Sequence, residues 1–354
     1  MTIYVLDYSQ TVYAIDTYIS VIWTTRYFSD GDFELTVTPT AEVINALQIG
    51  RFLVRDKDIS GSSTFKNVMR IENIELKTDA ESGNVLAVTG KSISSIVSQR
   101  VVLSQTSLRG KLTEAINLLL IENIMLPKNT DRTIQNFRYE RNTAISTTVD
   151  TQVTGDSLGA WLSTIAEKYG FGWDIRLDGG ELVFYLYQGT DRSYGQSTNP
   201  YVVFSPDFQN LLNTDYQYLT GEYKNVAVVA GEGEGAARAK TVVGTGTGLN
   251  RFEQWVDARD ISSNDGTVTA AEYTALLQAR GIEALTEHIN NELFDGDVDA
   301  TTQYVINRDF FIGDIVQIDT QYGITARTRI LEVIESEDAS GTRVIPTFGA
   351  MEVS

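Results

Sequence analysis

The chain has 354 residues, contains no cysteine and carries a formal net charge of −19. The lack of cysteine excludes a disulfide framework, a thiolate nucleophile and a zinc site built on cysteine. Acidic residues spread along the whole chain repel nucleic-acid phosphates, which argues against sequence-specific nucleic-acid binding. At this length we expect two to four modules. No run approaches the roughly 20 apolar residues that cross a bilayer, so we expect no stable membrane insertion.

The first hundred residues consist of short β-rich runs separated by turns. The runs are rich in β-branched and aromatic residues, and turn signals such as Ser29-Asp30-Gly31 lie between them. They cover residues 3–8, 13–28, 32–39, 51–56, 67–79 and 84–90. We therefore predict a meandering sheet or a small β-barrel for residues 1–105.

Two helices and a hairpin follow. Apolar residues recur at helical spacing in residues 112–124 and again in residues 158–169. A polar residue, Asp156 or Ser157, can cap the start of the second helix. Because a hairpin pattern over residues 173–189 comes next, this part of the chain predicts an α+β module.

The chain becomes β-rich again in residues 201–354. A third helix interrupts this part at about residues 269–293, where Thr269 and Glu272 form a capping box. His288 falls on its predicted apolar stripe, which favours a packing role. The last strands are predicted to contain an exposed acidic turn over residues 335–341.

Two glycine-rich segments are the most conspicuous local motifs. Gly231, Gly233 and Ala236 have the spacing of a dinucleotide-binding turn, with Glu253 near the position of a ribose-binding acid. That turn must open a long helix, and here the chain soon becomes strand-like, so we predict a mobile connection between strands. The candidate channel or interface residues in these loops are Gly231, Glu232, Gly233, Glu234, Gly235, Gly244, Gly246 and Gly248.

No catalytic, cofactor or metal site is predicted. His288 is the only histidine, so an ordinary zinc site is excluded. Residues 295–301 place oxygen ligands at alternate positions, but Ile306 stands where a calcium loop has an acid, so a solvated acidic loop is favoured over a calcium site. With 47 acidic residues, any carboxylate pair chosen from the sequence as a glycosidase site would be arbitrary.

Several stretches, in order, resemble the tail-associated or baseplate hub proteins at the tail tip of siphophages. The first are Val5-Leu6-Asp7, Trp23, Arg26-Tyr27 and Gly31-Asp32-Phe33-Glu34-Leu35. The others are residues 88–92, 99–102, 187–193, 203–205, Asn210, 223–225, 228–233, 248–253, 279–281, 313–316 and 330–333. Relatives usually carry Gly-Arg-Ser and Arg-Arg where this chain has Gly90-Lys91-Ser92 and Gln99-Arg100. The resemblance lies in the order and spacing of the motifs over nearly the whole chain.

The resemblance implies an α+β, β-rich fold related to contractile-tail baseplate hubs. Two tail-tube-like β-barrel or sandwich domains, residues 1–105 and 201–354, would flank an α+β accessory domain of residues 106–200. The glycine-bearing turns at Gly31-Asp32 and Gly313-Asp314 are expected to fix strand geometry.

The implied function is that of a non-enzymatic virion component. A homotrimer would join the distal tail ring and tape-measure protein to receptor-binding components, and it would form part of the DNA exit channel. An acidic lumen would let DNA pass without phosphate contacts. Two alternatives remain open. A carbohydrate-binding adhesin predicts exposed Trp or Tyr platforms, and a glycoside hydrolase predicts paired carboxylates in a cleft.

Overall fold

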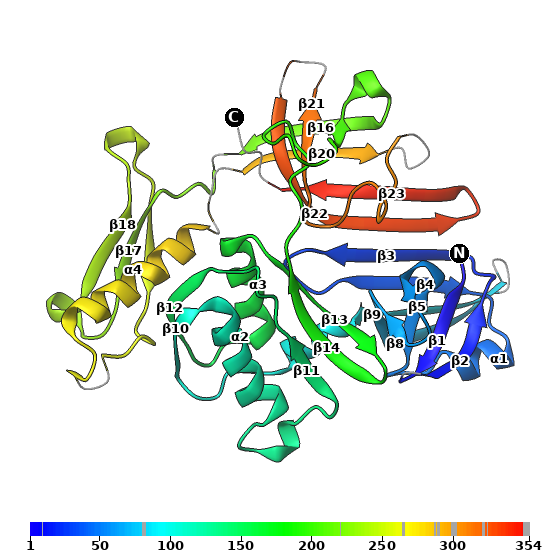
Figure 1. Cartoon of the computed structure of the whole chain (residues 1–354), viewed down its shortest axis with the longest axis horizontal. Helices are drawn as coiled ribbons and strands as arrows, with labels where there is room; N and C mark the ends of the chain where they lie inside the picture. The colour runs from blue at the N-terminus through cyan, green and yellow to red at the C-terminus, as the bar shows by residue number, and fades with distance from the viewer. Residues whose placement is uncertain are drawn as a thin grey trace.

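The computed structural model describes residues 1–8, 10–79, 83–219, 221–263, 266–286, 288, 291–298, 303–320, 323 and 325–349. The elements in Figure 1 are, in chain order, β1 (Ile3–Asp7), β2 (Gln10–Ile15), β3 (Ser20–Arg26), β4 (Asp32–Val37), α1 (Ala41–Ala46), β5 (Phe52–Arg55), β6 (Ile59–Ser60), β7 (Thr64–Phe65), β8 (Met69–Asp79), β9 (Gly83–Ser92), β10 (Thr106–Lys111), α2 (Leu112–Leu120), β11 (Phe137–Glu140), β12 (Thr148–Val153), α3 (Leu158–Tyr169), β13 (Gly172–Asp178), β14 (Glu181–Tyr187), β15 (Val203–Phe204), β16 (Leu211–Leu219), β17 (Val226–Ala230), β18 (Lys240–Gly244), β19 (Glu253–Asp257), α4 (Ala270–Thr286), β20 (Asn291–Val298), β21 (Ile315–Asp319), β22 (Thr325–Asp338) and β23 (Gly341–Phe348).

One sheet of 13 strands joins the two ends of the chain. Its order is β16-β20-β23-β22-β3-β4-β9-β8-β5-β1-β2, and β21, with β15 beside it, pairs with β22. The two halves meet where β22 pairs antiparallel with β3, from Glu332 opposite Arg26 to Asp338 opposite Ser20 (Figure 1). The predicted β-rich fold with α+β parts is confirmed, but the sequence did not predict that its two β-rich parts share a sheet.

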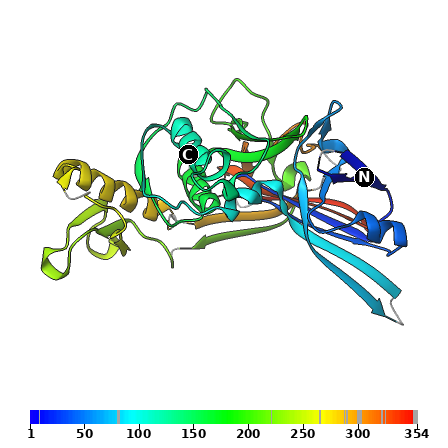
Figure 2. The ribbon, with the colours of Figure 1, turned by 90° about the horizontal axis from the view of Figure 1, so that it is seen from below.

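The first β unit comprises β1–β5, β8, β9 and α1. Its strands bury alternate residues, as β4 does with Phe33, Leu35 and Val37, because successive side chains of a strand point to opposite faces. Trp23 and Leu35 are completely buried in its core. The hairpin of β8 and β9 extends beyond the rest of this unit (Figure 2).

The helical unit comprises α2, α3 and β10–β14. Ser157 caps α3 by accepting a hydrogen bond from the amide of Ala160, and Gly170 ends the helix with a φ of 68°. Both predicted helices are thus confirmed. The apolar faces of α2 and α3 share one core with Trp173 and Phe184 of the β13–β14 hairpin.

The second β unit comprises β15, β16 and β20–β23. Phe204 lies at the centre of its core, with ring centroids 5.6 Å from those of both Phe310 and Phe348. The favoured interpretation of residues 295–301 as an acidic loop is wrong for residues 295–298, because they belong to β20, which pairs with β16 and β23. The remaining residues of that run, including Asp299, lie outside the described residues.

The outer unit comprises β17–β19 and α4, and it has a core of its own. The predicted capping box is present: the amides of Thr269 and Glu272 each donate a hydrogen bond to the other residue's side chain. The predicted end of this helix is wrong, because α4 ends at Thr286. His288 therefore lies in a turn beyond the helix, where its carbonyl accepts a hydrogen bond from the amide of Lys224.

Candidate functional site

Tyr27 lies where the first β unit, the helical unit and the second β unit meet, and it is fully buried. Its hydroxyl donates to the carbonyl of Gly170 at 3.2 Å and accepts from the amide of Gly189 at 3.1 Å. Its own amide donates to the carbonyl of Leu331 at 2.8 Å. Burial raises the pKa of the Tyr27 hydroxyl, so it stays a neutral donor. One side chain thus connects segments that are distant in sequence.

Glycines surround the Tyr27 ring because no Cβ fits there. A methyl group at Gly172 or Gly313 would overlap the ring, and one at Gly189 would overlap the carbonyl of Gly313. Gly313 also has a φ of 89°, a backbone angle that residues other than glycine rarely adopt. The junction therefore depends on close backbone approach.

Asp314 is a buried carboxylate, 1% exposed, next to this junction. It accepts hydrogen bonds from the amides of Thr190 and Phe311 at 2.7 and 3.0 Å. Arg192 donates to it at 2.7 Å. The carboxylate thereby holds the segment that leaves the helical unit against the second β unit.

Gly31 and Asp32 lie on the β3 side of the contact between β3 and β22, whereas Gly313 and Asp314 lie on the β22 side. A side chain at Gly31 would overlap the carbonyl of Thr24. Asp32 accepts a hydrogen bond from Arg26 at 2.5 Å, and Arg26 also contacts Glu332 of β22 at 2.6 Å. Both glycine-aspartate motifs are thus placed where the two halves of the sheet join. Their role in fixing strand geometry stays a prediction.

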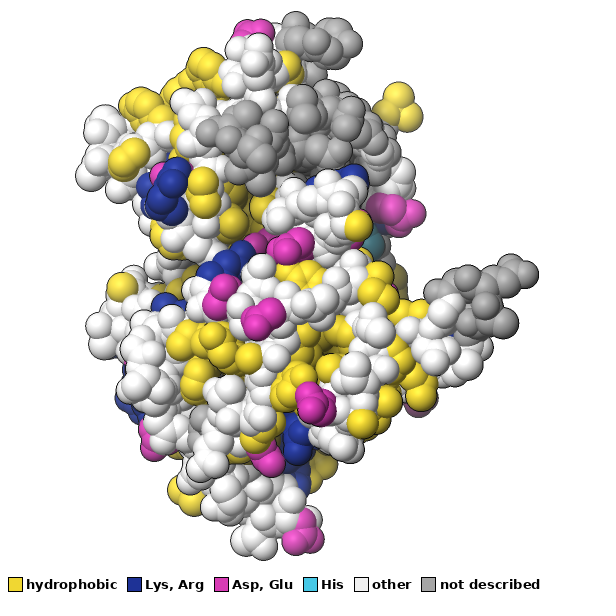
Figure 3. Space-filling view, turned by 90° about the vertical axis from the view of Figure 1, so that its right-hand side faces the viewer, with side chains coloured by type: hydrophobic (Ala, Val, Ile, Leu, Met, Phe, Trp, Pro, Cys, Tyr) yellow, Lys and Arg dark blue, Asp and Glu magenta, His cyan; other side chains and the backbone are white. Residues whose placement is uncertain are grey.

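Arg55 forms a second charged contact between the two β units. Its guanidinium is fully buried, lies 4.8 Å from the centroid of the Trp23 ring, and contacts Asp58 at 2.5 Å and Glu335 at 2.9 Å. Lys57 also pairs with Glu335. In the view of Figure 3 the molecule has an upper and a lower lobe, and acidic and basic side chains lie together at the boundary between them. The predicted exposed acidic turn is present but starts later than Glu335: β22 continues to Asp338, and the exposed turn of Ala339 and Ser340 follows. Glu335 is half-buried against Arg55 and Lys57.

The first glycine-rich loop, residues 231–235, connects β17 to β18. After Glu234 the chain forms a helical turn of only three residues, Gly235–Ala237, and then enters β18. The prediction of a connection between strands is confirmed, and its mobility stays a prediction. The amide of Glu232 donates to the Tyr273 hydroxyl at 2.7 Å, and its carboxylate accepts from the amide of Ser263 at 3.1 Å. The loop is thus fastened to α4 and to the segment before it.

The second glycine-rich loop, residues 244–248, follows β18 and is organised by Asn225. The carbonyl of Asn225 accepts from the amide of Thr245 at 3.0 Å. Its side chain bonds the carbonyl of Asn250 and the amide of Phe252 at 2.7 and 2.9 Å. Because the two loops lie at opposite ends of β18, the structure does not bring their glycines together.

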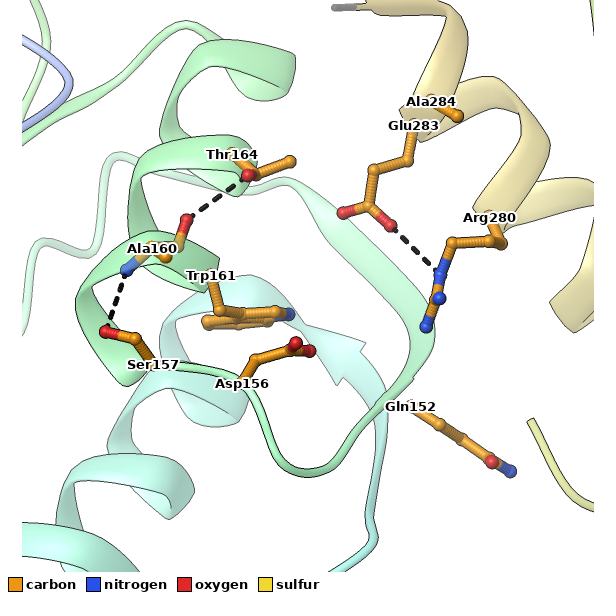
Figure 4. Close-up of a pocket in the computed structure, with 9 residues that line it drawn as sticks. All are labelled: Gln152, Asp156, Ser157, Ala160, Trp161, Thr164, Arg280, Glu283 and Ala284. Carbon is orange, nitrogen blue, oxygen red and sulfur yellow. Dashed lines mark hydrogen bonds and ion pairs between the residues drawn. The ribbon is translucent and has the colours of Figure 1, made fainter. Parts of the chain in front are cut away.

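A cleft of about 230 Å³ separates α3 from α4 (Figure 4). Asp156 lies beside Trp161 on one wall, and Glu283 faces Arg280 at 3.8 Å on the other. The Trp161 side chain is only 7% exposed, and Arg280 is also bound to Asp260 at 2.8 Å. Two acids and an aromatic residue line this cleft, which is the arrangement that the hydrolase alternative predicts. The full lining is Gln152, Asp156, Ser157, Ala160, Trp161, Thr164, Arg280, Glu283 and Ala284.

An aromatic side chain is exposed on the outer unit. Trp255 of β19 is 55% exposed on the sheet face opposite α4, near Val242, which is 52% exposed. Arg238 and Lys240 lie 5.5 and 5.6 Å from the centroid of the Trp255 ring. Such a platform is the feature that the adhesin alternative predicts.

Asp174 is a carboxylate in a small cavity between β13 and the first β unit. Burial raises its pKa to about 6, although hydrogen bonds from Ser94, the Ile175 amide and Tyr185 oppose the rise. The unfolded carboxylate has a pKa of about 3.9. The folded state therefore binds a proton more tightly, so this group stabilises the protein below the unfolded pKa and loses that effect as pH rises through about 6.

Asp174→Asn should remove this pH dependence. Between pH 5 and 8, we expect the wild-type free energy of unfolding to fall by about 1.4 kcal/mol relative to that of the variant. The full difference between the folded and unfolded pKa values corresponds to about 3 kcal/mol, and the rest of it is lost below pH 5. Urea unfolding of both proteins at pH 5, 6, 7 and 8 measures this difference and avoids pH values near zero net charge. A difference that is constant with pH would contradict the assignment.

Within the part of the chain that the structure describes, no group of three or more His, Asp or Glu side chains is placed to hold a metal ion. No helix in the described ranges has the length and apolarity needed to span a bilayer.

Comparison with known proteins assigns the chain to a family. Residues 2–350 match the family described as siphovirus ReqiPepy6 Gp37-like protein. The chain belongs to this siphovirus family. No curated protein matches it in sequence.

Solved structures of phage tail proteins share the fold. The 43 kDa tail protein of prophage MuSo2 from Shewanella oneidensis is 12% identical, with a TM-score of 0.61 over 99% of this chain and 98% of that one. A tail protein from Neisseria meningitidis MC58 is 13% identical, with a TM-score of 0.59 over 99% and 96%. Prophage tail protein gp18 from Listeria monocytogenes EGD-e is 12% identical, with a TM-score of 0.57 over 100% and 96%. By family this chain is a siphovirus protein, and it shares its fold with these phage tail proteins.

Proposed function

We propose that this protein is a structural component of the phage tail and forms a homotrimeric hub at its distal end. The observation that carries the proposal is the pairing of the first and second β units side by side in one sheet, through β3 and β22. Three copies would place six β units in a ring, which suits docking on a six-fold tail ring. Residues 1–105 and 201–354 would form the ring, with residues 106–200 as the accessory part.

In this proposal the hub joins the distal tail ring and tape-measure protein to receptor-binding proteins. DNA would leave through its centre, where acidic side chains in excess would avoid phosphate contacts. The loops at residues 231–235 and 244–248 would contact neighbours or narrow the channel. A neutral or basic lumen in the assembled ring would contradict the proposed role of the charge.

The first β unit presents apolar side chains that a neighbouring subunit would cover. Figure 3 shows hydrophobic side chains grouped on the lower lobe. Aliphatic residues between 38% and 59% exposed in this unit are Val12, Ile19, Ile22, Ile44, Ile49, Ile74 and Leu76. Exposed apolar surface of this kind is typical of subunit contacts.

The expected result is a particle with three times the chain mass of 39.2 kDa. Light scattering on the purified protein gives the mass, and negative-stain imaging of the same peak should show a three-fold ring with a central passage. Ile49→Glu and Leu76→Glu should shift the mass toward the monomer, because each places a charge in the contact. Leu118→Glu is the control, since Leu118 is 38% exposed but lies in α2 of the helical unit, outside the proposed ring.

Two other outcomes would favour the alternatives. A monomer that binds host glycan, and loses that binding in Trp255→Ala, would indicate an adhesin built on the exposed Trp255 platform. A monomer that releases reducing sugar from host cell walls, and loses this activity in Asp156→Asn, would indicate a hydrolase in the cleft between α3 and α4.

A further inference from the structure

A groove of about 610 Å³ crosses the helical unit between the start of β10 and the turn that follows α2. None of its lining residues belongs to the junction at Tyr27 or to the cleft between α3 and α4. Its lining residues are Val102, Leu103, Ser104, Gln105, Thr106, Ser107, Glu122, Asn123, Leu126, Lys128, Asn129 and Arg132.

Two leucines expose apolar surface in this groove. Leu103 is 62% exposed and Leu126 is 78% exposed, and Val101 beside them is 45% exposed. Leu126 follows a π-helical turn, Ile121–Met125, and its amide donates to the carbonyl of Ile121 at 2.8 Å. Such turns often occur at functional sites. Burying a leucine side chain is worth roughly 1.5–3 kcal/mol, so the pair offers a strong apolar anchor.

Two cations line the same groove, and a third lies beside it. Lys128 and Arg132 line the groove, and Arg100 lies next to Arg132, with its Nε donating to the Arg132 carbonyl at 3.2 Å. Burial, with the nearby charge of Arg132, lowers the pKa of Arg100. Within the described ranges, none of these three cations forms an ion pair with a carboxylate. The lining acid, Glu122, accepts a hydrogen bond from Thr106.

One edge of β10 has no strand beside it in the described structure. β10 pairs only with β12, in a sheet of two strands. Thr106 and Ser107, at the start of β10, belong to the groove lining. An extended segment could add along such an edge and direct alternate side chains into the groove. Lys111, exposed at the far end of β10, adds a further positive charge along this path.

We propose that this groove binds an extended acidic segment of a partner protein, with a leucine-sized side chain seated between Leu103 and Leu126. The cations at Lys128, Arg132 and Arg100 match carboxylates that flank the apolar anchor. The strand edge supplies backbone hydrogen bonds. The proposal concerns a single chain and does not depend on the proposed trimer.

The test uses a short fluorescein-labelled peptide in which aspartate and glutamate alternate with leucine. Fluorescence anisotropy with the full chain measures its dissociation constant. We expect Leu126→Ser to weaken binding roughly tenfold and Lys128→Glu roughly fivefold, with the acidic peptide released by salt. Leu249→Ser and Lys66→Glu are matched controls, because Leu249 is 97% exposed and Lys66 is exposed, both outside the helical unit. Neither control should change the affinity.

Three outcomes would overturn the proposal. The first is that a peptide with lysine in place of each acid, or with serine in place of each leucine, binds as tightly as the acidic peptide. The second is that the two groove variants leave the affinity for the acidic peptide unchanged. The third is that vesicles of dioleoylphosphatidylglycerol bind the protein with the same dependence on Leu126 and Lys128, which would indicate an anionic lipid surface. Circular dichroism of each variant confirms that a loss of binding reflects the groove and not unfolding.

Discussion

Gly313→Ala should destabilise the protein by about 2–5 kcal/mol. The left-handed backbone at Gly313, with a φ of 89°, costs roughly 1–2 kcal/mol for alanine. The new methyl group would also overlap the Tyr27 ring, and overpacking of a filled site costs typically 1–3 kcal/mol more. Urea unfolding followed by tryptophan fluorescence measures the loss.

Gly61→Ala separates the two contributions to this loss. Gly61 also has a positive φ, 66°, but no atom lies within 4 Å of the position that its Cβ would take. We therefore expect this control to lose only the backbone part, roughly 1–2 kcal/mol. Equal losses for the two variants would show that close packing around Tyr27 contributes nothing to stability.

Arg55→Ala should cost about 3–5 kcal/mol, because it leaves the buried carboxylate of Asp58 without its cation and removes one of the two cations that pair with the half-buried Glu335. Asp58 is 5% exposed, and the Glu335 side chain is 12% exposed. The variant also loses the contact of the guanidinium with the Trp23 ring. Thermal and urea unfolding measure the loss of stability. Hydrogen exchange should show the largest loss of protection where β3 pairs with β22.

Arg308→Ala is the control for Arg55→Ala. Arg308 pairs with Asp309 at 2.7 Å, but its side chain is 67% exposed. Exposed ion pairs contribute roughly 0–1 kcal/mol, so the control should unfold almost as the wild type does. If the two arginine variants were equally stable, the charged contact between the β units would not hold them together.

Local patterns in the sequence predicted the local structure well. The caps at Ser157 and at Thr269 with Glu272 are where expected, because a capping residue bonds amides only two or three positions away. The end of α4 was missed: the apolar spacing continues to His288, but the helix stops at Thr286. Periodicity alone does not indicate which residues begin the next strand, here β20.

The candidate site was predicted less completely. Gly313 and Asp314 were singled out from the sequence, but Tyr27 appeared only within a family motif, and Arg55 gave no signal. An isolated arginine in a β-rich run looks like a surface residue. It becomes a buried residue because Glu335, 280 positions away, and Asp58 compensate its charge.

Local patterns along the chain were enough to predict the segments that form helices and hairpins, the β-rich character of both ends and the family resemblance. These depend on periodicity, caps and the order of short motifs, all of which are read along the chain. The folded chain alone shows that β3 pairs with β22, that the outer unit has its own core, and which charges are buried. Strand partners distant in sequence are selected by burial and register across the whole sheet, and no local pattern records that choice.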